Sequence, residues 1–472
     1  MDRPFPDALS SASIRLVFQL ALTLQNIAFF RDAAVARWHF KTRHLALFDV
    51  VIPSRAHKIG AIAWEGIMRF DQSLLFAGLM LGVIAGTPAH AQKKYDPGAS
   101  DTTIKLGNIM PYSGPASAYS VIGKTQAAYF KKVNDDGGIN GRKIEFISYD
   151  DGYSPPKAIE QARKLIESDE VLLIFSPMGT PSNSAIQKYM NAKKVPQLFP
   201  ASYSSKWSDP KTYPWTMLLG TSYQTEGSIY AAYLLREKPD AKIAILYQND
   251  DFGKELLNGL KAGLGAKASM IVEETPYEVT DPTIDSQIVK LRHSGADVMF
   301  TFGTPKFVAQ SIKKIAELGW KPMHFIPNVA SSVGTVIVPA GVENAQGVLS
   351  GTFIKDASDP QWDNDKGMKA YTSFLAKYMP DANKADSLMI HGYMGAQLMV
   401  QVLKQSVDNL TRENVMKQAA SIKNFESDVL IPGILATTGE KDFSPLEDMQ
   451  MMRFKGSRWE PFGDVIRGRS DG

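Results

Sequence analysis

The feature that most constrains the fold of this chain is an alternation of short apolar segments with longer amphipathic ones, which occurs in two series. The first series spans residues 103–199 and the second spans residues 241–328. Segments such as Val171–Phe175 and Val298–Phe302 are short and continuously apolar, which is typical of strands buried in a parallel sheet. Because parallel strands are joined by crossover helices, the alternation predicts an α/β protein. Two series predict two doubly wound lobes with parallel-sheet cores.

The chain after residue 328 is expected to complete both lobes. It returns to helical spacing at Met368–Met379 and Ser387–Asp408, and it has the pattern of strands at Val429–Ala436 and Met449–Phe454. Three connecting strands are expected where Gly or Pro lies beside extended segments, near residues 219–222, 348–352 and 431–433. The predicted first lobe comprises residues 102–220 and 352–431, and the predicted second lobe comprises residues 221–351 and 432–462.

Residues 68–91 have the organisation of a secretory signal peptide. A charged start leads into the uncharged apolar run 74–85, and Ala-His-Ala at 89–91 forms a small-residue cleavage site. The run is shorter than the roughly 20 residues that a membrane-spanning helix needs. We therefore expect export to the periplasm and a soluble, non-lipidated mature protein that begins at Gln92. If translation starts at Met68, the methionine at the start of the signal, residues 1–67 are a spurious extension of the sequence. Otherwise we expect them to be a disordered extension.

The composition excludes several classes of protein. Residues 1–91 hold 9 of the 52 basic and 6 of the 49 acidic side chains, so the mature part carries 43 of each. This balance gives no indication of the basic surface that binding to nucleic acid requires. The absence of cysteine excludes disulfides, thiol catalysis, cysteine–zinc sites and a lipidated N-terminal cysteine.

The motifs of enzymes and metal sites are also missing. The mature part has three histidines, His293, His324 and His391, and they are scattered without a motif partner. The acidic pairs at 150–151 and 250–251 each follow a predicted strand, where they would bind a cation, act as paired carboxylates, or simply cap helices and turns. We predict no catalytic, cofactor-binding or metal-binding residue, and we expect a protein that is not an enzyme.

Small polar loops follow three strands of the first series, at residues 111–117, 176–183 and 201–205. In open α/β sheets, ligands bind beyond the carboxyl ends of the strands. Each loop supplies hydroxyls and backbone N–H groups near a helix start, where they would accept a ligand carboxylate or act only as helix caps. The three loops together favour an anion-binding site.

Four segments carry a resemblance to a known family. They are IKLGNIMPYSGPASAYSVIG at 104–123, NDDGGINGRKIEFISYDDGYSPPKAIEQARKLI at 134–166, FSPMGTPSNSAIQKYMNAKKVPQLFPAS at 175–202 and AILYQNDDFGKELLNGLKAGL at 244–264. Over residues 103–454 the chain resembles the branched-chain amino acid type of periplasmic substrate-binding protein. The resemblance implies the type I binding fold, in which two lobes joined by a three-strand hinge close on a small molecule. It also implies delivery of that molecule to an ABC permease in the inner membrane, without a cofactor.

The resemblance implies which residues bind the ligand. First-lobe loops of the family hold a ligand carboxylate, and second-lobe positions line the other side of the cleft. Carried over to this chain, the first-lobe positions are Ser113, Met178, Gly179, Thr180, Ala201 and Ser202, and the second-lobe positions are Phe252, Gly303 and Asn328.

One departure from the family bears on the ligand. Amino-acid binders of this type have an acidic residue after the strand that corresponds to residues 324–328, and here residues 325–331 contain none. Because a buried ammonium without a counter-charge costs several kcal/mol, we expect an organic acid with an aromatic or apolar body, and Asn328 would offer only a neutral hydrogen bond. Candidate apolar walls, each equally explained as core or surface, are Tyr119, Trp207, Phe252 and Phe302.

Three alternatives remain for the function. A receptor of this family would instead bind a branched-chain or other neutral amino acid, or an amide or urea-like compound. Similar folds also serve as cytoplasmic amide-sensing regulators, which the predicted signal peptide disfavours. An enzyme is disfavoured by the missing motifs. We expect a monomer.

Overall fold

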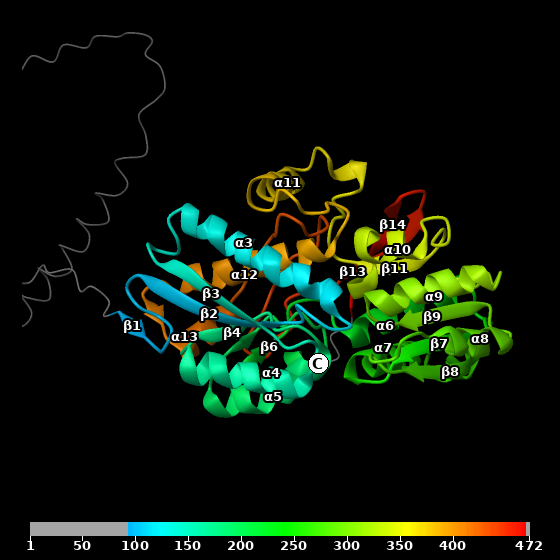
Figure 1. The fold of residues 1–472 in the computed structure, drawn as a ribbon, viewed down its shortest axis with the longest axis horizontal. Helices are drawn as coiled ribbons and strands as arrows, with labels where there is room; N and C mark the ends of the chain where they lie inside the picture. The colour runs from blue at the N-terminus through cyan, green and yellow to red at the C-terminus, as the bar shows by residue number, and fades with distance from the viewer. Residues whose placement is uncertain (1–92, 469–472) are drawn as a thin grey trace, which may run out of the picture. The chain divides into compact units, whose positions relative to one another are not determined.

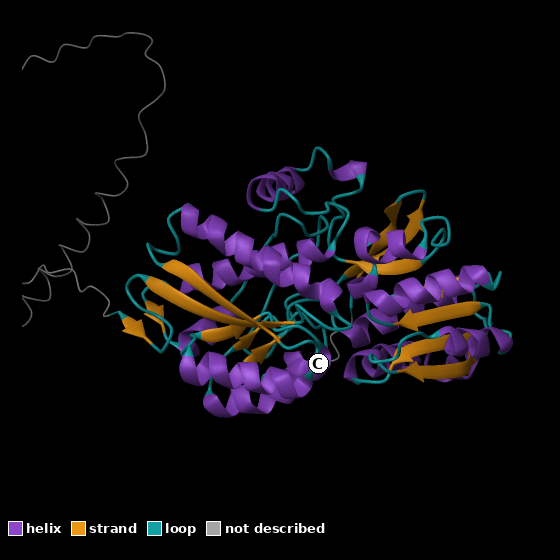
Figure 2. Cartoon of the chain, in the orientation of Figure 1, coloured by secondary structure: helices purple, strands orange, loops and turns teal. Residues whose placement is uncertain are grey.

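The computed structural model describes residues 93–468, which form two α/β lobes, each built on its own sheet (Figures 1 and 2). This architecture confirms the fold class predicted from the alternating segments. The predicted signal peptide and the 67 residues before it lie outside the described residues. No helix within residues 93–468 combines the length and the apolar character needed to cross a membrane.

The first lobe is built on five parallel strands in the order β3-β2-β4-β5-β6. The strands are β2 (Thr103–Met110), β3 (Lys143–Asp150), β4 (Leu173–Phe175), β5 (Gln197–Leu198) and β6 (Thr216–Met217). A separate pair joins β1 (Lys94–Tyr95) to β12 (Asn409–Leu410).

Helices cover both faces of the first sheet, with α3 and α12 on one face and α4 and α5 on the other (Figure 1). The first-lobe helices are α3 (Ser120–Asp135), α4 (Pro155–Arg163), α5 (Thr180–Lys193), α11 (Lys366–Tyr378), α12 (Leu388–Ser406) and α13 (Arg412–Ala419). Within β4, Leu173 and Phe175 pack with Phe130 of α3, whereas Ile174 packs with Ile186 of α5. This two-sided burial explains why the strand is apolar throughout.

The second lobe is built on seven strands in the order β14-β13-β11-β10-β9-β7-β8, of which β11 to β8 are parallel and β13 and β14 are antiparallel. The strands are β7 (Ile243–Gln248), β8 (Ile271–Tyr277), β9 (Val298–Phe302), β10 (Met323–Phe325), β11 (Leu349–Thr352), β13 (Met449–Lys455) and β14 (Arg458–Ile466). The helices are α6 (Tyr223–Glu237), α7 (Asp251–Leu264), α8 (Asp285–His293), α9 (Pro305–Glu317) and α10 (Val338–Ala340).

The chain passes between the two sheets three times. It leaves the first sheet after β6, returns after β11, and leaves again between residue 431 and β13. The second and third passages run antiparallel to each other, since the Lys355 N–H donates to the Val429 carbonyl at 2.8 Å and the Ile431 N–H donates to the Phe353 carbonyl at 3.0 Å. Each lobe is therefore assembled from segments that are distant in sequence.

Two segments differ from the sequence expectation. Residues 429–436 were expected as a strand but form only isolated bridges, because Pro432 lacks an N–H donor and Gly433 has a φ of 91°. Strand β14 had no predicted counterpart. It is a partly exposed edge strand that contains Pro461 and Gly463, and its sequence lacks the apolar alternation of a buried strand.

Close packing of α6 on α7 gives a prediction about stability. A Cβ atom at Gly259 would lie 2.3 Å from the Gln224 carbonyl oxygen. Gly259→Ala must push the two helices apart, so we expect a loss of roughly 1–3 kcal/mol in the free energy of unfolding. Asn258→Ala, on the exposed side of the same helix, should change it by less than about 0.5 kcal/mol. Thermal unfolding of both variants checks this, and an equally stable Gly259→Ala protein would show that the contact is not tight.

Candidate functional site

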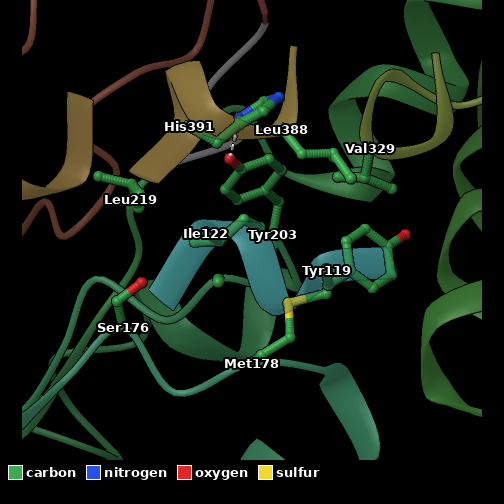
Figure 3. A pocket seen from close by; sticks show the side chains of 10 residues that line it. Tyr119, Ile122, Ser176, Met178, Tyr203, Leu219, Val329, Leu388 and His391 are labelled. Carbon is green, nitrogen blue, oxygen red and sulfur yellow. Dashed lines mark hydrogen bonds between the residues drawn. The ribbon is translucent and has the colours of Figure 1, made fainter. Parts of the chain in front are cut away.

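The loops beyond the strands of the first sheet enclose an apolar cavity that faces the second lobe (Figure 3). It is lined by Tyr119, Ile122, Ser176, Met178, Ala201, Tyr203, Leu219, Val329, Leu388 and His391. Val329 comes from the second lobe, in the loop after β10. The cavity volume is about 10 Å³, which is room for one water molecule. A ligand with a carbon skeleton therefore needs the lobes to separate before it enters.

A larger hollow, of about 440 Å³, lies in the second lobe between α9 and residues 343–348. It is bordered by the segment that enters β10 rather than by the loop that leaves it. Because ligands of open α/β sheets bind beyond the carboxyl ends of the strands, the cavity of Figure 3 is the candidate ligand site.

One hydrogen-bonded pair of side chains stands in the wall of the cavity. The Tyr203 hydroxyl and His391 Nδ1 lie 2.7 Å apart (Figure 3). Burial lowers the pKa of His391 to about 4 and raises the pKa of Tyr203 well above its usual value. Both side chains are therefore neutral at pH 7 and offer hydrogen bonding without charge.

Ser176 gives the cavity wall a strained backbone. Its φ is 53°, in the left-handed region that residues with a side chain seldom adopt. The conformation is held from two sides, because Asn108 Nδ2 donates to the Ser176 carbonyl at 2.9 Å and Gln126 Nε2 donates to Ser176 Oγ at 2.7 Å. Strain that is held in this way is typical of functional sites.

The start of α5 lies directly behind Met178 and forms an anion-favouring end of the cavity wall. Gly179 precedes the helix with a φ of 91°, and a Cβ atom there would lie 2.5 Å from the Tyr153 ring. The first turn of α5 contains no acidic residue, and no side chain caps it. The positive end of the helix dipole favours a carboxylate there, and among the described residues the one acidic group bonded to this turn is Asp151, which accepts from Ser182 Oγ at 2.6 Å.

The hydroxyls predicted to bind the ligand are already paired inside the protein. Thr180 Oγ1 and Ser202 Oγ lie 2.8 Å apart, and Trp207 Nε1 donates to Ser202 Oγ at 3.2 Å. Ser113 Oγ and the Ser113 N–H both donate to Asp150, at 2.6 and 3.1 Å. Of the predicted first-lobe residues, Met178 and Ala201 line the cavity. The other four, Ser113, Gly179, Thr180 and Ser202, are absent from its lining.

The acidic pairs at 150–151 and 250–251 form hydrogen bonds in turns and at a helix start, which is one of the roles expected for them. Asp151 accepts hydrogen bonds from Ser182 Oγ at 2.6 Å and from the Tyr153 N–H at 2.9 Å. Asp250 caps α7 by accepting from the N–H groups of Phe252 and Gly253. No group of three acidic or histidine side chains within residues 93–468 has the arrangement of a metal site.

The predicted second-lobe residues and apolar walls are mostly core. Phe252 is buried with its ring 4.9 Å from that of Tyr223, and Gly303 leaves room for the Tyr277 hydroxyl. Trp207 and Phe302 are fully buried. Among the four predicted walls, only Tyr119 borders the cavity.

Glu226 is a buried carboxyl group near the loop after β10 that was not among the residues predicted from the sequence. It lies in the first turn of α6, and its Oε1 accepts from the Asn328 N–H at 2.7 Å and from the Tyr230 hydroxyl at 2.6 Å. Burial raises its pKa to about 7. An acid in the first turn of a helix is so common that it gives no signal in the sequence. The loop after β10 thus lacks an acid of its own but rests on one from a distant helix.

Two lobes, with a cavity at their strand-end loops, define the class of two-lobed ligand receptors. The model of a family described as periplasmic binding protein matches residues 103–458, and the chain belongs to this family. Members of the family bind small molecules and work with ABC transporters. The Leu/Ile/Val-binding protein homolog 1 of Brucella suis is 22% identical over 363 residues, which cover 75% of this chain and 91% of that protein.

Solved structures share the fold and differ in ligand. The branched chain amino acid ABC transporter structure from Thermus thermophilus with bound valine has a TM-score of 0.71 at 18% identity, covering 78% of this chain and 97% of that one. The fatty acid ABC transporter substrate-binding protein from Thermomonospora curvata has a TM-score of 0.68 at 24% identity, and the match covers 79% of this chain and 95% of that one. The solute binding protein from Rhodopseudomonas palustris in complex with 3,4-dihydroxy benzoic acid has a TM-score of 0.66 at 20% identity, and the match covers 78% of this chain and 98% of that one.

The buried carboxyl of Glu226 gives a prediction about pH. Its ordinary pKa is 4.5 and its folded pKa is about 7, so its ionisation lowers the stability of the folded protein as the pH rises from about 4.5 to 7. The full effect is roughly 3 kcal/mol. Glu226→Gln keeps an acceptor for Asn328 and Tyr230 but cannot ionise, so its melting temperature should change less between pH 5 and pH 8 than that of the wild type.

The control for this experiment is Glu237→Gln, which changes an exposed residue of the same helix. It should retain the pH dependence of the wild type. An unchanged pH dependence in Glu226→Gln would show that this carboxyl does not titrate in the folded protein between these pH values.

Proposed function

We propose that this chain is a periplasmic receptor that binds a small aromatic or aliphatic carboxylic acid between its lobes and delivers it to an ABC importer of the inner membrane. One observation carries the proposal. The ten residues that line the cavity include no carboxylate, lysine or arginine, and their one histidine, His391, is neutral because burial lowers its pKa to about 4. An α-ammonium group enclosed there would lose its hydration without gaining a counter-charge, whereas an apolar body would lose nothing.

The start of α5 supports the assignment of the carboxylate end. Backbone N–H groups of a first helical turn that no side chain caps attract a carboxylate, and Met178 connects this turn to the cavity lining. The aromatic or aliphatic body would then lie against Ile122, Leu219 and Leu388. The neutral Tyr203–His391 pair would supply a hydrogen bond without repelling the acid.

Contacts between the lobes support closure on the ligand. Lys206 Nζ of the first lobe lies 2.6 Å from Asp251 Oδ2 of the second, and Ser184 Oγ donates to the same oxygen at 3.0 Å. Gln248 Nε2 donates to the Tyr153 hydroxyl at 3.4 Å. We propose that the lobes open and close about the three passages of the chain, and that a ligand held by both lobes favours the closed arrangement. The residues that line the cavity come from both lobes of one chain, so we propose that the protein binds its ligand as a monomer.

A branched-chain amino acid is the second candidate. It is favoured by the names of the Brucella relative and of the Thermus structure, and by the position of Glu226 beneath Asn328. If Glu226 is ionised in the complex, its charge would reach an ammonium group through the loop after β10. A measurement of ligand preference separates the two candidates.

The first test is calorimetry with matched pairs of ligands. Phenylacetate and 4-methylpentanoate should bind more tightly than phenylalanine and leucine, by at least about tenfold, because only the amino acids bury an uncompensated ammonium. Leucine binding more tightly than every acid without an amino group would replace this assignment with the amino-acid receptor.

Closure is tested by small-angle X-ray scattering of the protein with and without the tightest ligand. We expect the radius of gyration to fall at saturation, because the ligand stabilises contacts such as Lys206–Asp251. Asp251→Asn weakens this pair without touching the cavity, so it should need more ligand for the same compaction. An unchanged radius of gyration at saturation would contradict a hinged receptor.

A further inference from the structure

A second, polar chamber adjoins the apolar cavity on the side of Val329 and Leu388. Val329 and Leu388 line the cavity, and the residues directly before them, Asn328 and Ser387, line the chamber. The two spaces are therefore separated by single residues in two chain segments. A ligand that extends from the start of α5 past Leu388 would reach the chamber with its far end.

Within residues 93–468, Asp356 is the carboxylate of the chamber wall for which no ion pair is formed. Among the described residues, the other charged groups of the wall are paired, since Lys355 Nζ lies 2.8 Å from Asp365 Oδ1 and Asp359 Oδ1 lies 3.7 Å from Arg458 Nε. Asp356 Oδ1 accepts from the N–H and the hydroxyl of Ser358, at 2.8 and 2.7 Å. No described residue donates a hydrogen bond to Asp356 Oδ2. Desolvation raises the pKa of this carboxyl.

Asn328 provides a second, independent sign of a ligand. The residue is only 3% exposed, and its Nδ2 donates to the Gly351 carbonyl at 2.8 Å. Its Oδ1 is buried without a hydrogen-bond partner in the described part of the chain. Leaving a buried acceptor unpaired destabilises the folded protein. A donor on a ligand would remove that cost.

Two tryptophans complete the chamber. Trp362 and Trp459 are both in its wall, and Trp459 is fixed because its Nε1 donates to the Ser331 carbonyl at 2.7 Å. Indole faces attract cations more strongly than other aromatic side chains do. Lys355 Nζ already lies 5.6 Å from the centroid of the Trp362 ring. The carboxylate of Asp356, the unpaired amide oxygen of Asn328 and the indole of Trp459 favour a positively charged hydrogen-bond donor.

We propose that this chamber is a subsite for the ammonium or guanidinium end of an elongated ligand whose carboxylate is held at the start of α5. The inference rests on the proposed function and narrows its substrate class to acids with an apolar body and a cationic far end. It is compatible with the exclusion of α-amino acids, because the two charges sit at opposite ends of the ligand. An anionic far end is disfavoured, since Lys355 and Arg458 are already paired.

The test compares hexanoate with 6-aminohexanoate by calorimetry on the full mature chain. The wild type should bind 6-aminohexanoate at least fivefold more tightly, which is about 1 kcal/mol. Asp356→Asn keeps the oxygen that accepts from Ser358 but loses the charge, so the preference should fall below twofold while the affinity for hexanoate stays within twofold of the wild type. Asp363→Asn, an exposed neighbour with the same change in charge, should retain the preference.

The outcomes separate this subsite from the function on which it rests. A wild-type preference below fivefold, or a preference that survives in Asp356→Asn, overturns the subsite and leaves the acid receptor standing. Binding of neither compound, nor of the aromatic acids, overturns both. A purely structural role for Asp356 would lower the melting temperature of Asp356→Asn, whereas removal of a half-buried charge without a cationic partner should leave it equal or raise it.

Discussion

The cleft depends on one constraint, which is that the carboxyl ends of two parallel sheets face each other and are joined by three passages of a single chain. Parallel strands place all their following loops at one edge of a sheet. The paired second and third passages, bonded at Lys355–Val429 and Phe353–Ile431, fix where the two edges meet. The cavity, the start of α5 and the loop after β10 all derive their positions from this arrangement.

The charged groups near the site lie outside the cavity lining. The cavity lining contains no ionisable carboxylate or ammonium side chain, and its one histidine is kept neutral by desolvation. Carboxyl groups stand one layer away instead, Glu226 under Asn328 and Asp356 in the adjoining chamber. Their pKa values are raised by the same desolvation, so each is costly to the folded protein unless a proton or a ligand compensates it. Such a cost is acceptable where selectivity depends on it.

Much of this architecture was predictable from the sequence because local patterns determine it. The apolar composition of β4 follows from burial on both faces, and the polar loops at 176–183 and 201–205 follow from their position after buried strands. The Tyr203–His391 pair was not predictable, since its members are 188 residues apart and meet only when α12 packs beside the first sheet. Glu226 was not predictable because an acid in the first turn of a helix is common, and its contact with Asn328 joins residues 102 apart in the sequence. Ser113 was predicted to bind the ligand because its hydroxyl lies in a loop after a strand. In the structure this hydroxyl donates to Asp150 instead, a contact that the loop sequence does not reveal.

The central claim is that a carboxylate binds at the start of α5 with its apolar body in the cavity between the lobes. A crystal structure of the mature protein with its tightest acid tests this most directly. We expect the carboxylate within hydrogen-bonding distance of the backbone N–H groups of Thr180 and Ser182, because Pro181 has no N–H and the Gly179 N–H donates to the Ala201 carbonyl. The rest of the ligand should lie against Ile122, Leu219 and Leu388. A carboxylate bound elsewhere, or a ligand seated in the hollow beside α9, would contradict it.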